Sequence, residues 1–249
     1  MRMSREKRPS LVTTSWDDGH PLDLRIAELL ERYGFTGTFY VPRTCQRACM
    51  DAQGVHELGR RFEIGAHTLE HVRIDRLTDA QASGQLLGSR RWIEDLTGKR
   101  CDVFCFPWGR FKTRQLSLVR KAGFRAARTV ELLSIAAPRC VSGLWMIPTT
   151  IQAFPYRPLI YVRNAAKRLS ASQVLSLPAA FRSRDWITLA KELLVRTIQN
   201  GGVFHLWGHS WEIEEQGQWE NLDSLLKTMS ERRQEFKSVT NSELCGHAA

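Results

Sequence analysis

The chain has 249 residues, of which 43% are hydrophobic and 25% are charged, and its formal net charge at pH 7 is +10. This length and balance exclude a disordered or low-complexity protein and indicate a globular domain. No apolar run approaches the roughly 18–20 residues that span a bilayer, and the basic segment Met1–Ser10 lacks the apolar stretch of a secretory signal. We therefore expect a cytoplasmic protein, with a peripheral position on the inner face of the membrane left open.

Apolar runs and amphipathic stretches alternate along the chain. The predicted strands are Leu11–Trp16, Gly37–Val41, Phe62–Ala66, Val103–Phe106, Phe124–Ala127, Leu144–Ile147, Val203–Trp207 and Phe236–Val239. The predicted helices are Leu22–Tyr33, Val55–Arg61, Thr78–Leu96, Thr113–Ala122, Trp186–Gln199 and Trp219–Arg232. The proline-containing stretch from Leu132 to Pro158 is expected to be irregular apart from Leu144–Ile147. This alternation predicts one α/β domain, residues 11–240, between a basic N-terminal tail (1–10) and a C-terminal tail (241–249).

Four of the predicted strands run into residues that can perform metal or acid–base chemistry. Leu11–Trp16 leads into Asp17 and Asp18, and Phe62–Ala66 leads into His67 and His71. The other two strands lead into the Pro-Trp-Gly segment around Trp108 and into His209. Because an α/β barrel or parallel sheet places its active site at the carboxyl ends of its strands, we expect these groups to converge.

His67 and His71 are four residues apart, so a helical turn would place both imidazoles on one side. Two imidazoles and one carboxylate suit a catalytic zinc that keeps an open position. Asp17 and Asp18 supply the carboxylates. Such a ligand set also accepts cobalt, manganese or iron.

The segment Ser15–His20 resembles the Asp-Asp-Gly motif of polysaccharide deacetylases, the NodB-homology group of carbohydrate esterase family 4. His67–His71 matches that family's His-(Ser/Thr)-x-x-His motif, Phe104–Gly109 resembles its third motif, and Gly123–Thr129 is similar to a further family segment. The motifs occur in the family's order and the resemblance extends from Leu11 to about Val239. It implies a distorted (β/α) barrel and metal-dependent removal of an N-acetyl group from an amino sugar.

The resemblance also implies roles for individual residues. Asp18, His67 and His71 would hold one divalent metal ion, usually zinc. Asp17 would be the general base and His209 the general acid. The backbone N–H of Trp108 would help to bind the oxyanion.

One position departs from the family pattern. Many members carry an arginine in the third motif that pairs with the catalytic aspartate, and this chain has Cys105 there. Arg128 is the candidate replacement, and Arg110 is an alternative. The departure keeps two other functions open: hydrolysis of a different non-peptide C–N or ester bond, and glycan binding without catalysis. A binding module, however, has no need of both an acid and a base.

Sugar rings pack against aromatic side chains, and four tryptophans flank the expected site. Strand alternation should bury some of the four, so Trp108 and Trp211 are the predicted substrate contacts, with a place in the core as the alternative for each. The six cysteines are expected to be free thiols, in preference to a disulfide or a metal role, because their spacings are not those of zinc or redox motifs.

Tyr156–Arg184 is a basic amphipathic insertion in the predicted domain. Its apolar residues are Leu159, Ile160, Val162, Leu169, Val174, Leu175, Leu177 and Phe181, and its cations are Arg157, Arg163, Lys167, Arg168, Arg182 and Arg184. Such a segment either rests on an anionic membrane, near a lipid-linked glycan, or packs on the barrel with a solvated basic face. No nucleic-acid-binding motif accompanies the positive charge, so nucleic acid is not an expected partner.

Overall fold

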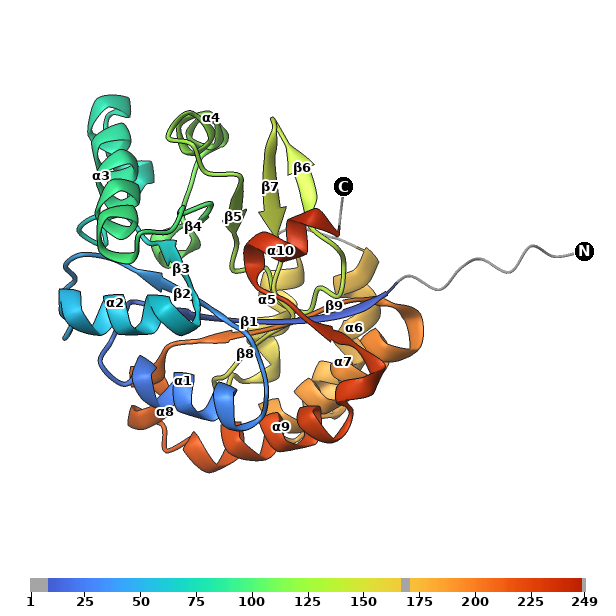
Figure 1. Ribbon diagram of the computed structural model, residues 1–249. Coiled ribbons are helices and arrows are strands. Elements are labelled where there is room, and N and C mark those ends of the chain that lie inside the picture. Colours follow the sequence, from blue (N-terminus) through green and yellow to red (C-terminus); the bar gives the residue numbers. More distant parts are fainter. Residues whose placement is uncertain (1–8, 167–170, 248–249) are drawn as a thin grey trace, which may run out of the picture.

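A computed structural model of the protein describes residues 9–166 and 171–247. One curved sheet, ten-stranded in the described residues, forms its centre, and helices pack around it (Figure 1). The sheet and helices make a single-domain α/β half-barrel, which confirms the expected distorted (β/α) barrel. No helix in the described ranges is long and apolar enough to cross a membrane.

The strands run in one direction with a single exception. They are β1 (Ser10–Asp17), β2 (Thr38–Val41), β3 (Glu63–Ala66), β4 (Val103–Cys105), β5 (Ala126–Arg128), β6 (Arg139–Val141), β7 (Leu144–Ile147), β8 (Ile151–Gln152), β9 (Gly202–Gly208) and β10 (Lys237–Ser238). Their order in the sheet is β6-β7-β5-β4-β3-β2-β1-β9-β8, with β10 beside β1, and only β6 and β7 are antiparallel. The carboxyl ends of the parallel strands therefore meet at one edge.

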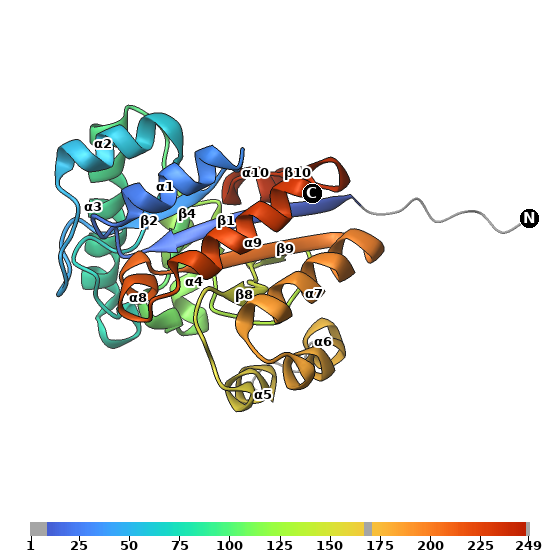
Figure 2. The same cartoon turned by 90° about the horizontal axis from the view of Figure 1, so that it is seen from below.

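Ten α-helices in the described residues pack around the sheet. They are α1 (Asp23–Arg32), α2 (Ala52–Arg61), α3 (Asp79–Thr97), α4 (Thr113–Lys121), α5 (Pro158–Ala166), α6 (Ala171–Arg182), α7 (Trp186–Asn200), α8 (Ser210–Glu215), α9 (Trp219–Glu231) and α10 (Asn241–Gly246). Short 3-10 turns cover Ile74–Arg76, Pro107–Gly109 and Arg233–Glu235. From below, α5 and α6 lie beyond α7, away from α2 and α3 (Figure 2).

Local sequence explains where the best-defined elements begin and end. Thr78 and Gln81 form a reciprocal capping box at the start of α3, and Gly98 ends that helix with φ +64°. All eight residues of β1 are buried, because helices cover one face of this central strand and the barrel interior covers the other.

The expected C-terminal tail is wrong for residues 241–246, which form α10. Asn241 is fully buried, where its amide nitrogen donates to the Tyr40 hydroxyl (2.8 Å) and its Oδ1 accepts from Thr13 Oγ1 (3.0 Å). Leu244 and Cys245 belong to the same buried cluster as residues of β1 and β9. The domain therefore extends through α10. Residues 1–8 of the expected N-terminal tail lie outside the described residues, and Ser10 already belongs to β1.

Two other regions carry more structure than the sequence suggests. The stretch 132–158 contains β6 and β8 besides the predicted Leu144–Ile147 strand, and α8 follows directly after β9. The basic insertion forms α5 and α6; its residues Lys167, Arg168 and Leu169 lie outside the described residues. β6 and β8 are two-to-three-residue strands without a periodic pattern, which is why the sequence does not reveal them.

Candidate active site

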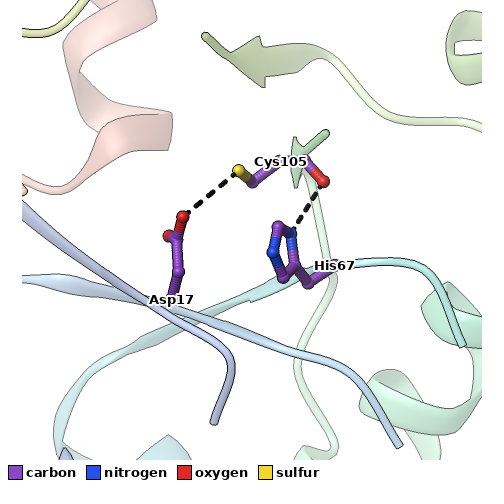
Figure 3. A group of neighbouring side chains, drawn as sticks. All are labelled: Asp17, His67 and Cys105. Carbon is purple, nitrogen blue, oxygen red and sulfur yellow. Dashed lines mark hydrogen bonds between the residues drawn. The ribbon is translucent and has the colours of Figure 1, made fainter. Parts of the chain in front are cut away.

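Asp17, the last residue of β1, is buried against a cation. Arg128 of β5 forms an ion pair with its Oδ1, and the Cys105 thiol of β4 lies 3.7 Å from its Oδ2 (Figure 3). Burial raises the pKa of Asp17, but Arg128, together with His67 and His209, outweighs burial and holds the pKa below its ordinary value. Cys105 and Arg128 are register partners in neighbouring strands, so the cation stands one strand away from the motif position. Of the two candidate replacements, the structure places Arg128 at Asp17.

The loop that carries His67 and His71 is not helical, contrary to the expected helical turn. Thr68 and His71 have φ of +60° and +47°. The Thr68 hydroxyl accepts a hydrogen bond from the Val72 amide at 2.9 Å, and Gln85 of α3 accepts from two further amides of the loop. These side-chain bonds replace the helical ones and still bring both imidazoles to one point, with ring centroids 4.9 Å apart.

Asp18, His67 and His71 form a cluster with the chemistry of a metal site. Nε2 of His67 and Nε2 of His71 lie 3.5 and 3.2 Å from Asp18 Oδ1, and one ligand atom from each residue lies within 4.8 Å of the others. Oδ1 of Asp18 is buried and has no hydrogen-bond partner among the described residues. His67 Nδ1 donates to the Cys105 carbonyl at 2.9 Å, which leaves the Nε2 lone pair free. An unpartnered carboxylate oxygen between two imidazoles fits a divalent cation.

A second cluster, Asp17, His67 and Cys105, is less suited to a metal (Figure 3). Burial raises the pKa of the Cys105 thiol, although the Arg128 guanidinium opposes this, so the thiolate that a metal requires is disfavoured. Asp17 is already paired with Arg128. The cluster of Asp18, His67 and His71 is therefore the better ligand set.

His209, at the start of α8, faces both aspartates. Its Nε2 lies 4.0 Å from Asp17 Oδ2 and 3.9 Å from Asp18 Oδ2, and its Nδ1 bonds Glu212 Oε2 at 2.6 Å. Burial lowers the pKa of His209, but the Glu212 carboxylate, together with Asp18 and Asp17, outweighs burial and raises it above its ordinary value. Glu212 also accepts from Gln152 Nε2 at 2.7 Å. The family motifs do not include Glu212, although the His-x-x-Glu spacing at the start of a helix signals such a pair.

The two predicted substrate tryptophans stand on different sides of the cluster. Trp108 is 52% exposed, and its ring lies 4.4 Å from the His71 ring. Trp211 donates from Nε1 to Asp18 Oδ2 at 3.0 Å, and the Arg47 guanidinium lies 3.6 Å above its ring. Trp211 therefore positions Asp18 as well as facing the cavity. Trp16 and Trp207 are buried.

These groups open into a cavity of about 430 Å³. All the candidate site residues line it except Arg128, which is fully buried beneath it. The prediction of Arg128 as a substrate contact is therefore wrong, because its guanidinium forms an ion pair with Asp17 and does not line the cavity. The cavity is lined by Asp17, Asp18, His67, His71, Phe106, Trp108, Gly109, Val130, Leu132, Gln152, Tyr156, Ile160, Arg163, Asn164, Trp207, His209, Trp211 and Glu212.

Backbone strain gathers at this cavity. Six non-glycine residues in the described ranges have a positive φ, and four of them belong to the site: Asp18, Thr68, His71 and Trp108. Each such conformation costs on the order of 1 kcal/mol or more and persists only where the surroundings impose it. The chain therefore holds its ligand loops in one defined geometry.

Most of the candidate site residues lie in the part of the chain that matches a protein-family model. Residues 4–127 match the family model described as polysaccharide deacetylase. The chain belongs to the polysaccharide deacetylase family. A peptidoglycan deacetylase of Helicobacter pylori is 28% identical over 102 residues, 41% of this chain and 34% of that protein. YxkH of Bacillus subtilis, named as a candidate polysaccharide deacetylase, is 21% identical over 137 residues, 53% of this chain and 49% of its own. The match thus spans half or less of these curated relatives.

Solved structures of low sequence identity share the fold of this deacetylase family member. Puue allantoinase matches with a TM-score of 0.69 and 12% identity, over 96% of this chain and 90% of its own. A family 4 acetyl xylan esterase from Clostridium thermocellum, in complex with a cobalt ion, matches with 0.57 and 16%, over 95% and 90%. A family 4 pseudoenzyme from Bacillus anthracis matches with 0.53 and 17%, over 96% and 66%.

Proposed function

We propose that this chain is a metal-dependent deacetylase that removes an N-acetyl group from an amino sugar in an oligo- or polysaccharide. One observation carries the proposal. The three side chains that could bind a metal line the same cavity as the Asp17 carboxylate and the His209 imidazole, and His209 is hydrogen-bonded to Glu212. Two groups whose environments push their pKa values apart are the usual acid and base of a hydrolase. The family match and the H. pylori relative's name point to the same reaction.

Asp18, His67 and His71 would hold the metal, and zinc is the proposed ion; the cobalt in the C. thermocellum esterase fits the same class of site. When bound, a divalent cation acidifies water and polarises the acyl carbonyl. Asp18 would bind the ion through Oδ1, which no hydrogen bond occupies among the described residues. Trp211 holds its other oxygen.

Asp17 and His209 would move the protons. Arg128 keeps Asp17 ionised, so its carboxylate accepts a proton from the attacking water. Glu212 keeps His209 protonated to a higher pH and fixes its ring, so Nε2 delivers a proton to the departing amine. The backbone N–H of Trp108 is the proposed oxyanion donor.

A chain of sugars is the proposed substrate, with a lipid-linked glycan as one form of it. Trp108 stands between the 430 Å³ cavity and a second hollow of about 670 Å³, and it lines both. The reacting sugar would therefore occupy the cavity and the next sugar of the chain the second hollow, with the exposed Trp108 ring between them. Arg110, the alternative partner for Asp17, lines the second hollow instead.

Acetate release tests the proposal. Chelated protein is incubated with a panel of N-acetylated oligosaccharides, with and without zinc, beside Asp17→Asn and the surface control Asp79→Asn. We expect zinc-dependent release that Asp17→Asn lowers by roughly 10²–10⁴-fold and Asp79→Asn leaves intact. Asp17→Asn should still take up zinc, which shows that the fold survives.

Absence of acetate release by zinc-loaded wild type would overturn the proposal. Release from acetate esters or small amides would assign the site to another C–N or ester bond. Saturable glycan binding without any turnover would assign it to recognition alone.

A further inference from the structure

The helices α5 and α6 expose an unusual amount of apolar surface. The described chain has six exposed large hydrophobic side chains, and four lie on these helices: Leu159, Val174, Leu175 and Phe181. Their exposed fractions are 72%, 48%, 71% and 60%. Clustered exposure of this kind marks an interaction surface, whereas single exposed hydrophobics are ordinary.

On each of the two helices, the spacing of the sequence places exposed apolar residues on the same side as an arginine. Val174, Phe181 and Arg182 stand at positions i, i+7 and i+8 of α6, so they share one side of that helix, which is exposed at all three. Leu159 and Arg163 stand at i and i+4 of α5, and both are exposed. We call this surface, made of Arg157, Leu159, Arg163, Val174, Leu175, Phe181, Arg182 and Arg184, the basic apolar face.

The sequence of this segment is purely basic. Residues 156–184 contain six Lys or Arg and no Asp or Glu, within a chain of net charge +10. Asp185 directly follows the segment and caps α7, and Glu192 of α7 pairs with Arg182 at 2.9 Å. Arg157 and Arg184 are exposed without an ion pair in the described ranges. The partner of this surface must therefore be both anionic and apolar.

We propose that the basic apolar face docks this protein on an anionic lipid bilayer. Side chains of Leu, Val and Phe would enter the acyl boundary while arginines contact lipid phosphates. A second copy fits poorly, because a twofold contact would oppose two purely basic surfaces. Nucleic acid fits poorly too, since three of the four apolar side chains are aliphatic and offer no ring for base stacking.

The docking surface is continuous with the cavity. Ile160, Arg163 and Asn164 of α5 line the cavity wall, and Arg163 is exposed on the same helix as Leu159. Figure 2 shows α5 and α6 as an outlying pair beyond α7, free to approach a flat surface. Docking would therefore bring the cavity mouth to the level of lipid headgroups. This inference goes beyond the deacetylase proposal and stands without it.

Vesicle co-sedimentation of the full chain tests the docking. Vesicles contain either phosphatidylglycerol with phosphatidylcholine or phosphatidylcholine alone, and no substrate is present. The double variants are Leu175→Ser with Phe181→Ser and Arg157→Gln with Arg184→Gln. Leu87→Ser, at an exposed hydrophobic of α3, is the matched control.

We expect binding to the anionic vesicles only, weakening as salt rises. Losing two cations should lower the partition coefficient roughly 30-fold, at about 1 kcal/mol per basic residue near the surface. Losing Leu175 and Phe181 should lower it roughly tenfold or more, and Leu87→Ser should leave it unchanged. The exposed sites allow all variants to fold, which circular dichroism checks.

Equal sedimentation with neutral vesicles, or none with anionic ones, would overturn the docking. A dimer of the wild type in solution that becomes monomeric in the double variant Leu175→Ser with Phe181→Ser would also overturn the docking, because the basic apolar face would then join two copies. Acetate release by the zinc-loaded wild type from a short water-soluble oligosaccharide is a separate readout. Absence of that release would count against the deacetylase proposal and not against the docking.

Discussion

Replacing Arg128 with methionine removes the guanidinium that pairs with Asp17 while keeping a side chain of similar length. The side chains of Arg128 and Asp17 are 0% and 4% exposed, so the substitution breaks a buried ion pair from one side. Breaking a buried ion pair from one side costs about 3–5 kcal/mol. Domains of this kind have a total stability of roughly 5–15 kcal/mol, so the variant should remain folded but lose a large share of its free energy of unfolding.

The pH dependence of that loss follows from the pKa of Asp17. Arg128 is the largest group that lowers this pKa against burial, so without it the pKa of the carboxyl rises. The native pair stabilises the protein above the unfolded pKa of about 3.8–3.9 and loses that effect as pH falls through the lowered folded pKa. In the variant Asp17 can take up a proton more readily. The difference in stability should therefore be largest near pH 7 and shrink toward pH 4.

Urea denaturation of wild type, Arg128→Met and Arg128→Lys at pH 4, 5 and 7 measures these effects. Arg128→Lys keeps the charge but not the planar fork, so its loss should be intermediate. Arg60→Met, at an exposed arginine whose partner Glu57 is also exposed, is the control and should change the free energy of unfolding by less than about 0.5 kcal/mol. An Arg128→Met variant no less stable than Arg60→Met would refute the reasoning.

Three further outcomes follow from the site. His71→Gln should weaken zinc affinity by more than about 100-fold, measured by competition with a chromophoric chelator, while His56→Gln on α2 should leave it unchanged; equal affinities would remove His71 from the ligand set. Glu212→Gln should lower the pKa of His209 and move the alkaline limb of the kcat/KM profile to lower pH, with Glu214→Gln as control; an unmoved limb would contradict a protonated His209. Burial raises the pKa of Asp23, whose Oδ1 accepts from Ser210 Oγ at 2.5 Å. The contribution of Asp23 to the free energy of unfolding should therefore fall by about 1.4 kcal/mol per pH unit above about 4 until Asp23 ionises in the fold. Asp23→Asn should flatten that slope in urea melts, and parallel curves for the two proteins would show that Asp23 stays charged.

Elements with local signals were predictable from the sequence. The bounds of α3 follow from Thr78 and Gly98, and β1 follows from a continuous apolar run that ends in two aspartates. The convergence of Asp18, His67 and His71 follows from parallel strands that share an edge. These inferences need only chain-local patterns and one general rule of α/β folds.

Features that depend on tertiary contacts were not predictable. The loop between His67 and His71 departs from a helix because Gln85, from α3, binds its amides. Helix α10 is short, and burial of Asn241 against Tyr40 and Thr13 holds it in place. The position of Arg128 against Asp17 requires the register of β4 with β5, which a single sequence does not specify.

The shift of the guanidinium from β4 to β5 makes two substitutions depend on each other. Cys105→Arg alone would restore the family motif, yet it would place a second cation in a sealed space with the single carboxylate of Asp17. Loss of Arg128 alone would leave that carboxylate bare. Either single substitution therefore leaves one charge too many or too few beside Asp17, and only the double exchange keeps one cation for the carboxylate. Placing the family's arginine at position 105 should therefore destabilise this protein unless Arg128 is replaced at the same time.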